Sequence, residues 1–310
     1  MSIRIGIITN PHAKLNKRNP LRPKLLGYIL GQRGITEITN SLEDLQKVAR
    51  KFLQHGINLV AINGGDGTIS LTISTFIHVY KDHPLPKIAL LCGGTMNVIA
   101  INLGIKGSPE NLLALMLEKA SDSEPFETIS LPTIKVENRY GFLFADGTSS
   151  LILEEFYRNK TDHFGAFLLG VRLVFSTLFN GPLTKKLIKE QQIAFQAHPH
   201  PKIYHASLGT YATTLKTMPM NIPMFLNDCP SKHLQAISIT CPATSLIRRI
   251  LKILMSKKVG IDRDRITYFC QKLHITARAN EPYTLDGEIF HPAPKELHIS
   301  LGPTIEFIKI

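Results

Sequence analysis

Two strand-length apolar runs that each end in a pair of glycines constrain the fold of this chain most strongly. Residues 59–63 lead into GGDGT at 64–68, and residues 87–92 lead into GGTMN at 93–97. Because glycine carries no Cβ, the N–H groups of such turns can approach a bound anion closely, and a following helix start favours negative charge. Two turns of this kind at the strand ends of one parallel sheet converge on one crevice, where open α/β sheets bind ligands.

The first 120 residues alternate apolar runs with helix-length amphipathic segments. Strands are predicted over Ile3 to Thr9 and over the two runs before the glycines. A helix is predicted over 41–55, because its apolar residues recur at three- and four-residue spacing after Ser41, a good N-cap. Another is predicted over 109–119. This rhythm predicts a doubly wound, mostly parallel α/β sheet.

The pattern changes around residues 121–132 to shorter alternating runs separated by proline-rich turns. Such runs are typical of antiparallel strands, so we expect a mainly antiparallel, β-sandwich-like second domain. The predicted boundaries are an α/β domain over 1–130 and a β-rich domain over 131–299. The final strand, about 300–310, returns to the first domain.

Composition narrows the class of partner without selecting one. The 310 residues carry a formal net charge of +12, which suits phosphates, nucleic acid or an anionic membrane surface. Four dispersed cysteines without a CxxC pair predict neither a disulfide framework nor a zinc site and favour a cytoplasmic location. The start lacks the features of a signal peptide, and the apolar segment 164–179 is too short to span a bilayer and contains Arg172.

A third turn follows the first strand, where Asn10 can bond its own turn and Pro11 fixes the exit of the chain. The sequence contains neither a Walker A loop nor a Rossmann fingerprint. Three strand ends with small or phosphate-compatible residues still predict a nucleotide site. Asp66 would repel a phosphate directly, so it suits a Mg²⁺ ion, a hydroxyl or a helix cap. The simpler alternative is a set of tight βα turns without a ligand.

The motifs NP, GGDGT, GGTMN and a late LDGE at 285–288 occur in an order and spacing that resemble one family. It is the diacylglycerol kinase catalytic domain family of lipid kinases, which includes sphingosine kinases and is related to NAD kinase. The resemblance implies that residues 1–130 form a nucleotide-binding, NAD kinase-like α/β domain and that residues 131–299 form a β-sandwich-like, lipid-substrate domain. It is close over the N-terminal domain, whereas residues 150–275 match by position alone.

The resemblance also implies roles for individual residues. ATP, the co-substrate, would lie over the turns, and Mg²⁺ would accompany it. Asp286 and Glu288 match the acidic pair from which the family draws its general base, and Asp66 would organise metal or acceptor. An LDGE hairpin with an Asp-Gly turn is the structural alternative. The residues expected to bind the nucleotide are Asn10, Pro11, Thr39, Gly64, Gly65, Asp66, Gly67, Thr68, Gly94, Thr95 and Asn97.

The sequence departs from the family pattern at three places. Val98 stands where the family commonly has an aspartate, and Ser70 and Leu71 replace an Asn-Glu pair. Near the expected Mg²⁺ site of the second domain only Asp228 occurs, without a following glycine. These departures leave the metal ligands unassigned and the activity open.

Other segments were weighed for membrane or metal contact. Residues 244–258 can form a basic amphipathic helix that rests on anionic lipid or packs on the domain core, and the lysine-rich segment 181–192, with Lys185, Lys186 and Lys189, is equally ambiguous. His198, His200 and His205 lie among prolines, which argues against a metal site. No aromatic-basic motif suggests a nucleic-acid partner.

The sequence therefore predicts an ATP- and Mg²⁺-dependent lipid kinase that phosphorylates a lipid hydroxyl at the membrane surface, with diacylglycerol-like lipids favoured over sphingoid bases. The enzyme would be cytoplasmic with peripheral contact to the inner membrane face, and its oligomeric state stays open, a homodimer included. One alternative is an NAD kinase-like enzyme. The other is a catalytically inactive lipid- or nucleotide-binding regulator.

Overall fold

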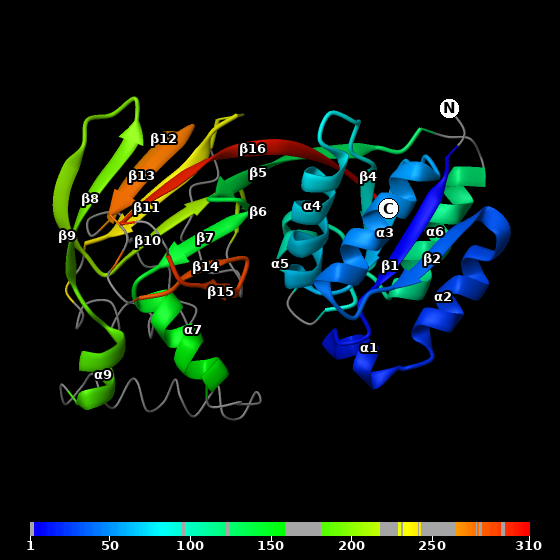
Figure 1. The fold of residues 1–310 in the computed structure, drawn as a ribbon, viewed down its shortest axis with the longest axis horizontal. Helices are drawn as coiled ribbons and strands as arrows, with labels where there is room; N and C mark the ends of the chain where they lie inside the picture. The colour runs from blue at the N-terminus through cyan, green and yellow to red at the C-terminus, as the bar shows by residue number, and fades with distance from the viewer. Residues whose placement is uncertain are drawn as a thin grey trace. The chain divides into compact units, whose positions relative to one another are not determined.

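The fold was obtained as a computed structural model (Figure 1). It forms two compact units. Unit 1 comprises Met1–Thr133, Thr217–Asn221 and Gly302–Ile310, and unit 2 comprises Ile134–Lys216 and Ile222–Leu301. The described residues are 3–94, 97–121, 125–158, 181–217, 229–230, 232–240, 242, 265–276, 278, 281–292 and 295–310.

Unit 1 contains a parallel sheet, as the sequence predicts. Its strands follow the order β2 (Gly34–Ile38), β1 (Ile5–Thr9), β3 (Leu59–Asn63), β4 (Lys87–Leu90) and β16 (Glu296–Ile308). β16 runs parallel to β4, with Phe307 opposite Ile88. All residues of β1 and β3 are buried, which explains why these strands appear in the sequence as continuous apolar runs.

Helices connect these strands. α3 (Leu42–Gln54) begins where its N-cap Ser41 accepts a 3.1 Å hydrogen bond from the Asp44 N–H. Its face toward the sheet includes Phe52, whose ring lies so close to Gly6 that a Cβ there would clash with it. The remaining helices of unit 1 are α1 (Lys14–Arg18), α2 (Arg22–Leu30), a 3₁₀ turn at Gly31–Arg33, α4 (Asp66–Tyr80), α5 (Val98–Asn102) and α6 (Pro109–Ser121).

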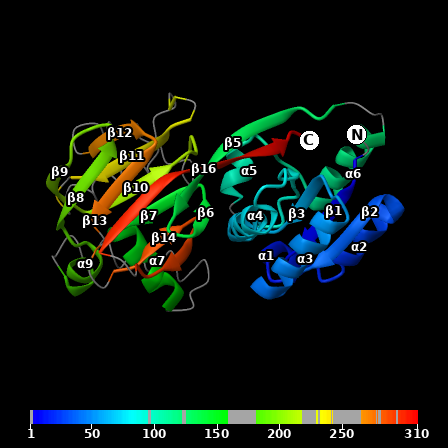
Figure 2. The same cartoon turned by 45° about the horizontal axis from the view of Figure 1, so that its top comes forward.

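Unit 2 contains antiparallel strands in two sheets (Figure 2). In one sheet β16 pairs with β13 (Lys272–Thr276), which is followed by β8 (Gln191–His198) and β9 (Ile203–Ser207). In the same sheet β5 (Thr128–Val136) pairs with β16 and with β6 (Arg139–Gly141). The other sheet has the order β12 (Arg265–Cys270), β11 (Leu234–Ile239), β10 (Gly209–Thr213), β7 (Leu143–Asp146), β14 (Tyr283–Leu285) and β15 (Glu288–Phe290).

Both sheets of unit 2 contribute to one hydrophobic core. Phe195 and Leu273 come from the first sheet, and Phe144, Ala236 and Leu285 come from the second. Alternate residues of each strand therefore point inward, which is the packing of a β-sandwich. The expected fold class, an α/β unit followed by an antiparallel β unit, is confirmed.

One helix of unit 2 is not predicted by the sequence. α7 (Thr148–Arg158) lies in a region whose alternating runs suggested strands, whereas α9 (Pro182–Leu187) lies within the segment 181–192 that was considered as a basic amphipathic helix. α7 buries Thr148, Ser150 and Leu151 in its first turn, so tertiary contacts select a helix here. Among the described residues, no helix is long and apolar enough to cross a membrane. The segments 164–179 and 244–258 lie outside the described residues.

Candidate functional site

The carboxyl edge of the parallel sheet brings most of the predicted nucleotide residues together. β1 pairs in register with both β2 and β3, so Thr39, Asn10 and Gly64 follow the ends of three adjacent strands. The Thr39 N–H donates to the Thr9 carbonyl at 3.0 Å, and the Asn10 N–H donates to the Asn63 carbonyl at 3.1 Å. Pro11, partly buried, continues the first of these turns.

Asn10 joins the first turn to the second through its side chain. Its Nδ2 donates to Thr68 Oγ1 at 2.8 Å, while its Oδ1 accepts from the His12 N–H at 2.8 Å. Thr68 occupies the first turn of α4 rather than its N-cap, which is Gly65. The Thr68 hydroxyl therefore joins α4 to the turn that follows β1 and does not cap the helix.

The two glycine pairs lie directly against each other. A Cβ on Gly65 would lie 3.3 Å from the Cα of Gly94, and a Cβ on Gly94 would lie 2.8 Å from Asn97 Oδ1 and closer still to the Cα of Gly65. A Cβ on Gly93 would lie 2.9 Å from the Gly64 nitrogen. Backbone meets backbone at this point, so any side chain would push the turns apart.

Asp66 links the GGDGT turn to the helix that follows GGTMN. Its Oδ1 accepts a 3.0 Å hydrogen bond from the Ile99 N–H in the first turn of α5. Burial raises the pKa of the Cys92 thiol to about 11, and the negative charge of Asp66 adds to the effect. Cys92 is therefore a neutral thiol at pH 7, and Asp66 stabilises a helix start across the two turns.

Asn97 closes the second turn in the left-handed conformation, with a φ of 46°. Its Nδ2 donates to the Gly94 carbonyl at 3.1 Å. Its Oδ1 is buried and has no hydrogen-bond partner among the described residues, and the same holds for Asn63 Oδ1. The first N–H groups of α4 also lack carbonyl partners within the helix. Thr95 lies outside the described residues.

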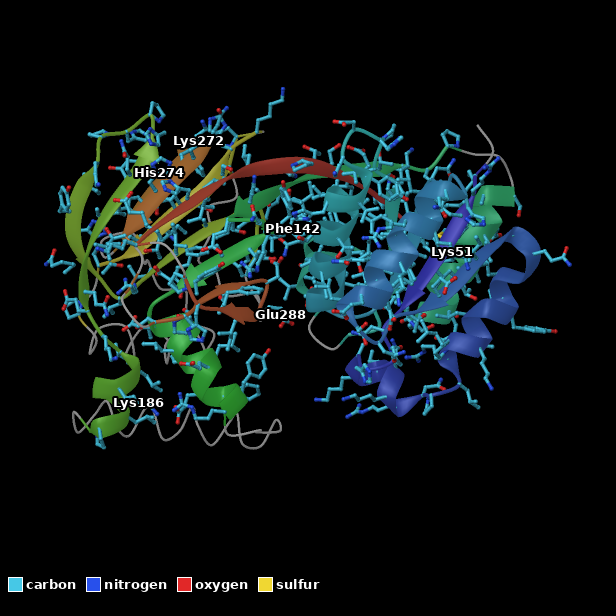
Figure 3. All side chains as sticks on the ribbon, viewed as in Figure 1. Lys51, Phe142, Lys186, Lys272, His274 and Glu288 are labelled. Carbon is cyan, nitrogen blue, oxygen red and sulfur yellow. The ribbon has the colours of Figure 1, made fainter. Side chains whose placement is uncertain are left out.

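The LDGE segment forms the tight hairpin between β14 and β15. Asp286 and Gly287 both have positive φ, 50° and 87°, as a two-residue type I′ turn requires. The Asp286 carboxylate accepts from the N–H of Phe142, at 2.9 and 3.1 Å, and from that of Leu143 at 2.8 Å. Glu288 is exposed (Figure 3). Of the two candidate bases, one is therefore fixed by backbone donors and the other extends from the hairpin.

A buried charge cluster in unit 2 was missed by the sequence analysis. The side chains of Arg278 and Asp146 are 1% and 3% exposed, and Arg278 Nε lies 3.4 Å from Asp146 Oδ1. Asp146 Oδ1 also accepts a 2.6 Å bond from the Thr210 N–H, and Arg278 Nη2 donates to the Ser207 carbonyl at 3.1 Å. Glu281, likewise buried, accepts from Gln191 Nε2 at 2.8 Å.

The cluster retains polar atoms without hydrogen-bond partners in the described structure: Arg278 Nε and Nη1, Asp146 Oδ2 and Glu281 Oε2. Burial raises the pKa of Asp146 and of Glu281, although the positive charge of Arg278 opposes the shift in both. No sequence motif indicated this cluster, because Asp146 lies 132 positions before Arg278, although Glu281 follows Arg278 by only three.

The remaining predicted residues belong to unit 2. His198 ends β8, and its Nε2 lies 3.5 Å from Nδ1 of His274 on the neighbouring strand, whereas His205 Nε2 lies 2.7 Å from Ser238 Oγ. Lys186 pairs with Glu155 at 2.7 Å, and Lys189 lies 3.7 Å from Glu281. Asp228 and the side chain of Lys185 lie outside what the structure describes.

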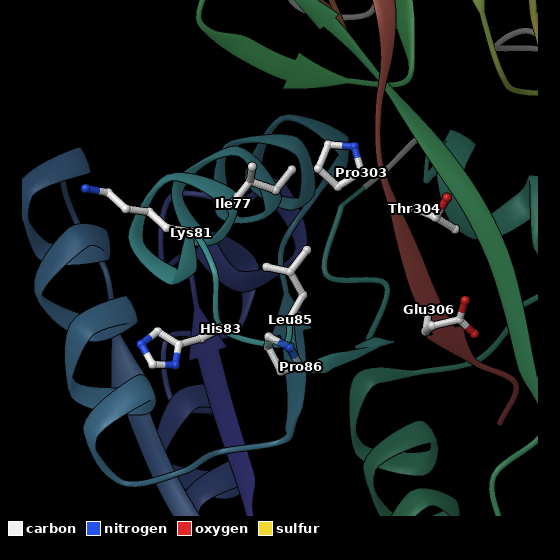
Figure 4. A pocket seen from close by; sticks show the side chains of 8 residues that line it. All are labelled: Ile77, Lys81, His83, Leu85, Pro86, Pro303, Thr304 and Glu306. Atoms are coloured by element: carbon white, nitrogen blue, oxygen red, sulfur yellow. The ribbon is translucent and has the colours of Figure 1, made fainter. Parts of the chain in front are cut away.

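A cavity of about 310 Å³ opens at the opposite end of unit 1 (Figure 4). It lies where α4 ends and β4 begins, whereas the glycine turns lie where α4 begins and β4 ends. The cavity is therefore separate from the predicted phosphate site. It is lined by Ile77, Lys81, His83, Leu85, Pro86, Pro303, Thr304 and Glu306.

Comparison with known proteins connects these turns to a family. Residues 4–128 match the diacylglycerol kinase catalytic domain profile. The expected family resemblance is confirmed. A curated relative, "Probable lipid kinase YegS-like" from Stenotrophomonas maltophilia (strain K279a), is 31% identical over 94 residues. This alignment covers 29% of the chain and 30% of that relative, so the similarity spans less than a third of its length.

Solved structures are similar in fold to both units of the chain. A diacylglycerol kinase from Bacillus anthracis str. Sterne matches with a TM-score of 0.67 and 14% identity, covering 99% of this chain and 97% of that one. A second structure from the same organism matches with a TM-score of 0.70 and 15% identity over the same shares. The two-unit architecture is thus that of diacylglycerol kinase-like proteins.

Proposed function

We propose that the protein is an ATP-dependent lipid kinase that transfers the γ-phosphoryl group to a lipid hydroxyl. The diacylglycerol kinase catalytic domain match over residues 4–128 carries this proposal, since it covers the three turns at the carboxyl edge of the sheet. Diacylglycerol-like lipids are the first substrate class to test, ahead of sphingoid bases.

The turns supply what triphosphate binding needs. Gly64, Gly65 and Gly94 keep side chains away from the sheet edge, and α4 begins there with N–H groups available to an anion. Asn10 and Thr68 hold two turns together by their 2.8 Å bond. These groups would hold the phosphates, with Pro11, Thr39, Gly67, Thr95 and Asn97 completing the proposed nucleotide site.

Within the part of the chain that the structure describes, magnesium fits as a partner of the nucleotide. Among the described residues, no three His, Cys, Asp or Glu side chains are grouped to hold a metal. Mg²⁺ is commonly held by one or two carboxylates together with substrate phosphates. Asp66 engages one carboxylate oxygen with the Ile99 N–H and would offer the other to the ion. When bound, the ion would neutralise charge on the phosphates.

Proton removal from the acceptor hydroxyl is assigned to the hairpin of unit 2. Asp286 is held by the backbone N–H groups of Phe142 and Leu143, which fixes its orientation. Glu288 is exposed on the following strand. A general base must accept a proton at hydrogen-bond distance, so either carboxylate can serve, and the other would then position it or the substrate.

Transfer of label from radiolabelled ATP to lipid tests the proposal. The purified protein is incubated with Mg²⁺ and mixed micelles of diacylglycerol, of sphingosine or of a total lipid extract, and products are separated and identified by mass spectrometry. Labelled lipid with one acceptor class is expected. No labelled lipid with any acceptor, beside an active lipid kinase control, would reject the proposal.

The same assay separates the rival functions. Label appearing in NAD instead of lipid would identify an NAD kinase-like enzyme. An inactive nucleotide-binding regulator is favoured by one observation: Val98 offers no carboxylate in the first turn of α5, and Asp66 is committed to capping that helix. ATP binding without turnover, unchanged in Asp286→Asn, would identify that class.

Paired variants assign the base. Asp286→Asn and Glu288→Gln both keep the size of the side chain, so kcat is compared at saturating lipid. We expect the variant of the base to lower kcat by about 100-fold or more with little change in ATP affinity. The non-base variant should alter KM for lipid instead. Equal kcat for both variants and wild type would remove the hairpin from the chemistry.

A further inference from the structure

The outer face of α2 carries large apolar side chains that the fold leaves uncovered. Leu21, the N-cap, is 68% exposed, Leu25 is 42% exposed and Tyr28 is 87% exposed. At 100° per residue these positions fall within one narrow arc of the helix. Leu26 and Leu30 lie on the opposite side and are fully buried. The helix is therefore anchored by one apolar face and presents a second one outward.

Basic side chains flank this outer face. Lys24 lies beside it on α2, and Arg18 precedes Leu21 by three residues, which limits the distance between their Cα atoms to about 11 Å. Lys17 and Lys24 are exposed, as is Arg18, and none of the three forms an ion pair with a described residue. Figure 1 shows α1 leading into the N-terminal end of α2.

The local charge is one-sided. No Asp or Glu occurs before Glu37, whereas Arg4, Lys14, Lys17, Arg18, Arg22, Lys24 and Arg33 do. Arg22 is neutralised by Glu110 of α6, with Nε 2.6 Å from Oε1, so it anchors α2 to the unit rather than facing solvent. The remaining positive charge around the outer face has no acidic neighbour in the same segment.

We propose that the α1–α2 surface, formed by Lys17, Arg18, Leu21, Lys24, Leu25 and Tyr28, docks the protein on an anionic phospholipid bilayer. Leucine and tyrosine side chains can enter the interface between headgroups and acyl chains, while lysine and arginine contact anionic headgroups. A protein partner is less well matched, because lysine is depleted at the centres of protein interfaces. The surface would bring a kinase to its lipid, but it is defined by binding alone.

Vesicle sedimentation tests this surface without ATP or a lipid substrate. The full-length protein is mixed with vesicles of phosphatidylcholine alone or of phosphatidylcholine with one third phosphatidylglycerol, and the bound fraction is measured at several salt concentrations. The wild type should bind the anionic vesicles and lose binding as salt rises. Because no phosphoryl transfer is measured, failure here and failure of the proposed kinase activity are separate outcomes.

Two variants divide the apolar from the basic contribution. Leu21→Gln/Leu25→Gln/Tyr28→Gln should weaken the partition coefficient by about tenfold or more, because these side chains no longer leave water. Lys17→Gln/Arg18→Gln/Lys24→Gln should weaken it by about fivefold per side chain at low salt and flatten the salt dependence. Both should keep the thermal unfolding of the wild type, since the altered side chains are exposed.

Matched controls come from other exposed positions. Leu115→Gln/Tyr204→Gln changes side chains that are 46% and 75% exposed elsewhere, and Lys87→Gln/Lys272→Gln/Lys295→Gln removes three other exposed charges. We expect both controls to bind vesicles like the wild type. Unchanged binding by the α2 apolar variant would overturn the proposal. A second result would also overturn it: the wild type sediments as a dimer, and the α2 apolar variant sediments as a monomer but still binds vesicles. That result would assign the surface to a second copy of the chain.

Discussion

The carboxyl edge of unit 1 and the interior of unit 2 place polar chemistry in opposite ways. At the glycine turns side chains are absent, Gly65 and Gly94 meet backbone to backbone, and hydrogen bonds from Asn10 and to Asp66 join neighbouring turns. In unit 2 the charged side chains of Asp146, Arg278 and Glu281 are buried together, and several of their atoms lack hydrogen-bond partners among the residues that the structure describes. The first arrangement leaves backbone donors for a ligand, whereas the second depends on charge balance inside the protein.

The largest effect is expected from removal of the buried cation. Arg278→Leu leaves Asp146 buried without its positive neighbour and leaves Glu281 with the half-exposed Lys189, so the free energy of unfolding should fall by about 3–5 kcal/mol. Chemical denaturation followed by circular dichroism measures this change. Arg139→Leu is the control, because Arg139 forms a half-exposed pair with Glu137 at 3.0 Å and should cost less than about 1 kcal/mol. Similar values for both variants would contradict the importance of the cluster.

A side chain at the glycine contact should have the next largest effect. Gly94→Ala places a Cβ against Gly65 and Asn97, which should lower the free energy of unfolding by about 1–3 kcal/mol and abolish ATP binding at concentrations that saturate the wild type. Calorimetric titration with ATP and denaturation measure the two effects. In α2, Gly27→Ala meets only the Thr36 side chain at 3.5 Å and should stabilise by up to about 1 kcal/mol. Retained ATP binding in Gly94→Ala would dissociate this contact from the nucleotide site.

A smaller effect is expected at the helix cap formed by Asp66. Asp66→Ala removes the acceptor of the Ile99 N–H and should cost about 1 kcal/mol of unfolding free energy. Asp66→Asn keeps an oxygen there and should restore most of that loss. If Asp66 also holds Mg²⁺, both variants will lose phosphoryl transfer although only one loses stability. Equal activity of Asp66→Asn and wild type would confine Asp66 to the structural role.

The smallest effects are opposite pH dependences in the two units. Burial raises the pKa of Asp146 despite Arg278, so its folded state keeps a proton above the ordinary value of about 3.9, and the associated stability is lost as pH rises through the folded pKa. Burial would also raise the pKa of Glu110, but its hydrogen bond and charge pairing with Arg22 outweigh this and lower it. Its contribution is therefore present above about pH 4.3 and is lost as pH falls through the folded pKa.

Urea midpoints compared across pH test these signs. The stability difference between the wild type and Asp146→Asn should decrease as pH rises, whereas that between the wild type and Glu110→Gln should decrease as pH falls. Each variant removes one titrating group, so the slope of the difference reports that group. Two slopes of the same sign would show that burial does not dominate at Asp146.

The sequence predicted the parts of this structure that depend on local pattern. Continuous apolar runs gave β1 and β3, Ser41 gave the start of α3, and the Asp286-Gly287 dipeptide gave a hairpin turn, because each follows from nearby residues. The family motifs also marked the strand ends that the fold brings together. Short β2 and the first turn of α7 depend on tertiary contacts, so their sequences alone did not identify them.

Long-range polar contacts could not be predicted in the same way. The bond between Asp66 and the Ile99 N–H joins residues 33 apart, and Arg278 meets Asp146 across even more of the chain. Nothing in the residues around Asp66 distinguishes a helix cap from a metal ligand. The exposed apolar face of α2 was missed because its residues, Leu21, Leu25 and Tyr28, are interspersed in the chain with the buried Leu26 and Leu30. The exposed and buried faces can therefore be told apart only in the folded structure.

The hydrogen bond from the Ile99 N–H to Asp66 supplies a spectroscopic probe of the proposed nucleotide site. This amide belongs to α5, yet its acceptor belongs to the other glycine turn. If bound ATP draws the Asp66 carboxylate toward Mg²⁺, the Ile99 amide will lose its hydrogen-bond acceptor, and its nuclear magnetic resonance signal will shift. Isotope labelling of this one position would thus show whether the two turns respond to ligand together, even in a protein that performs no transfer.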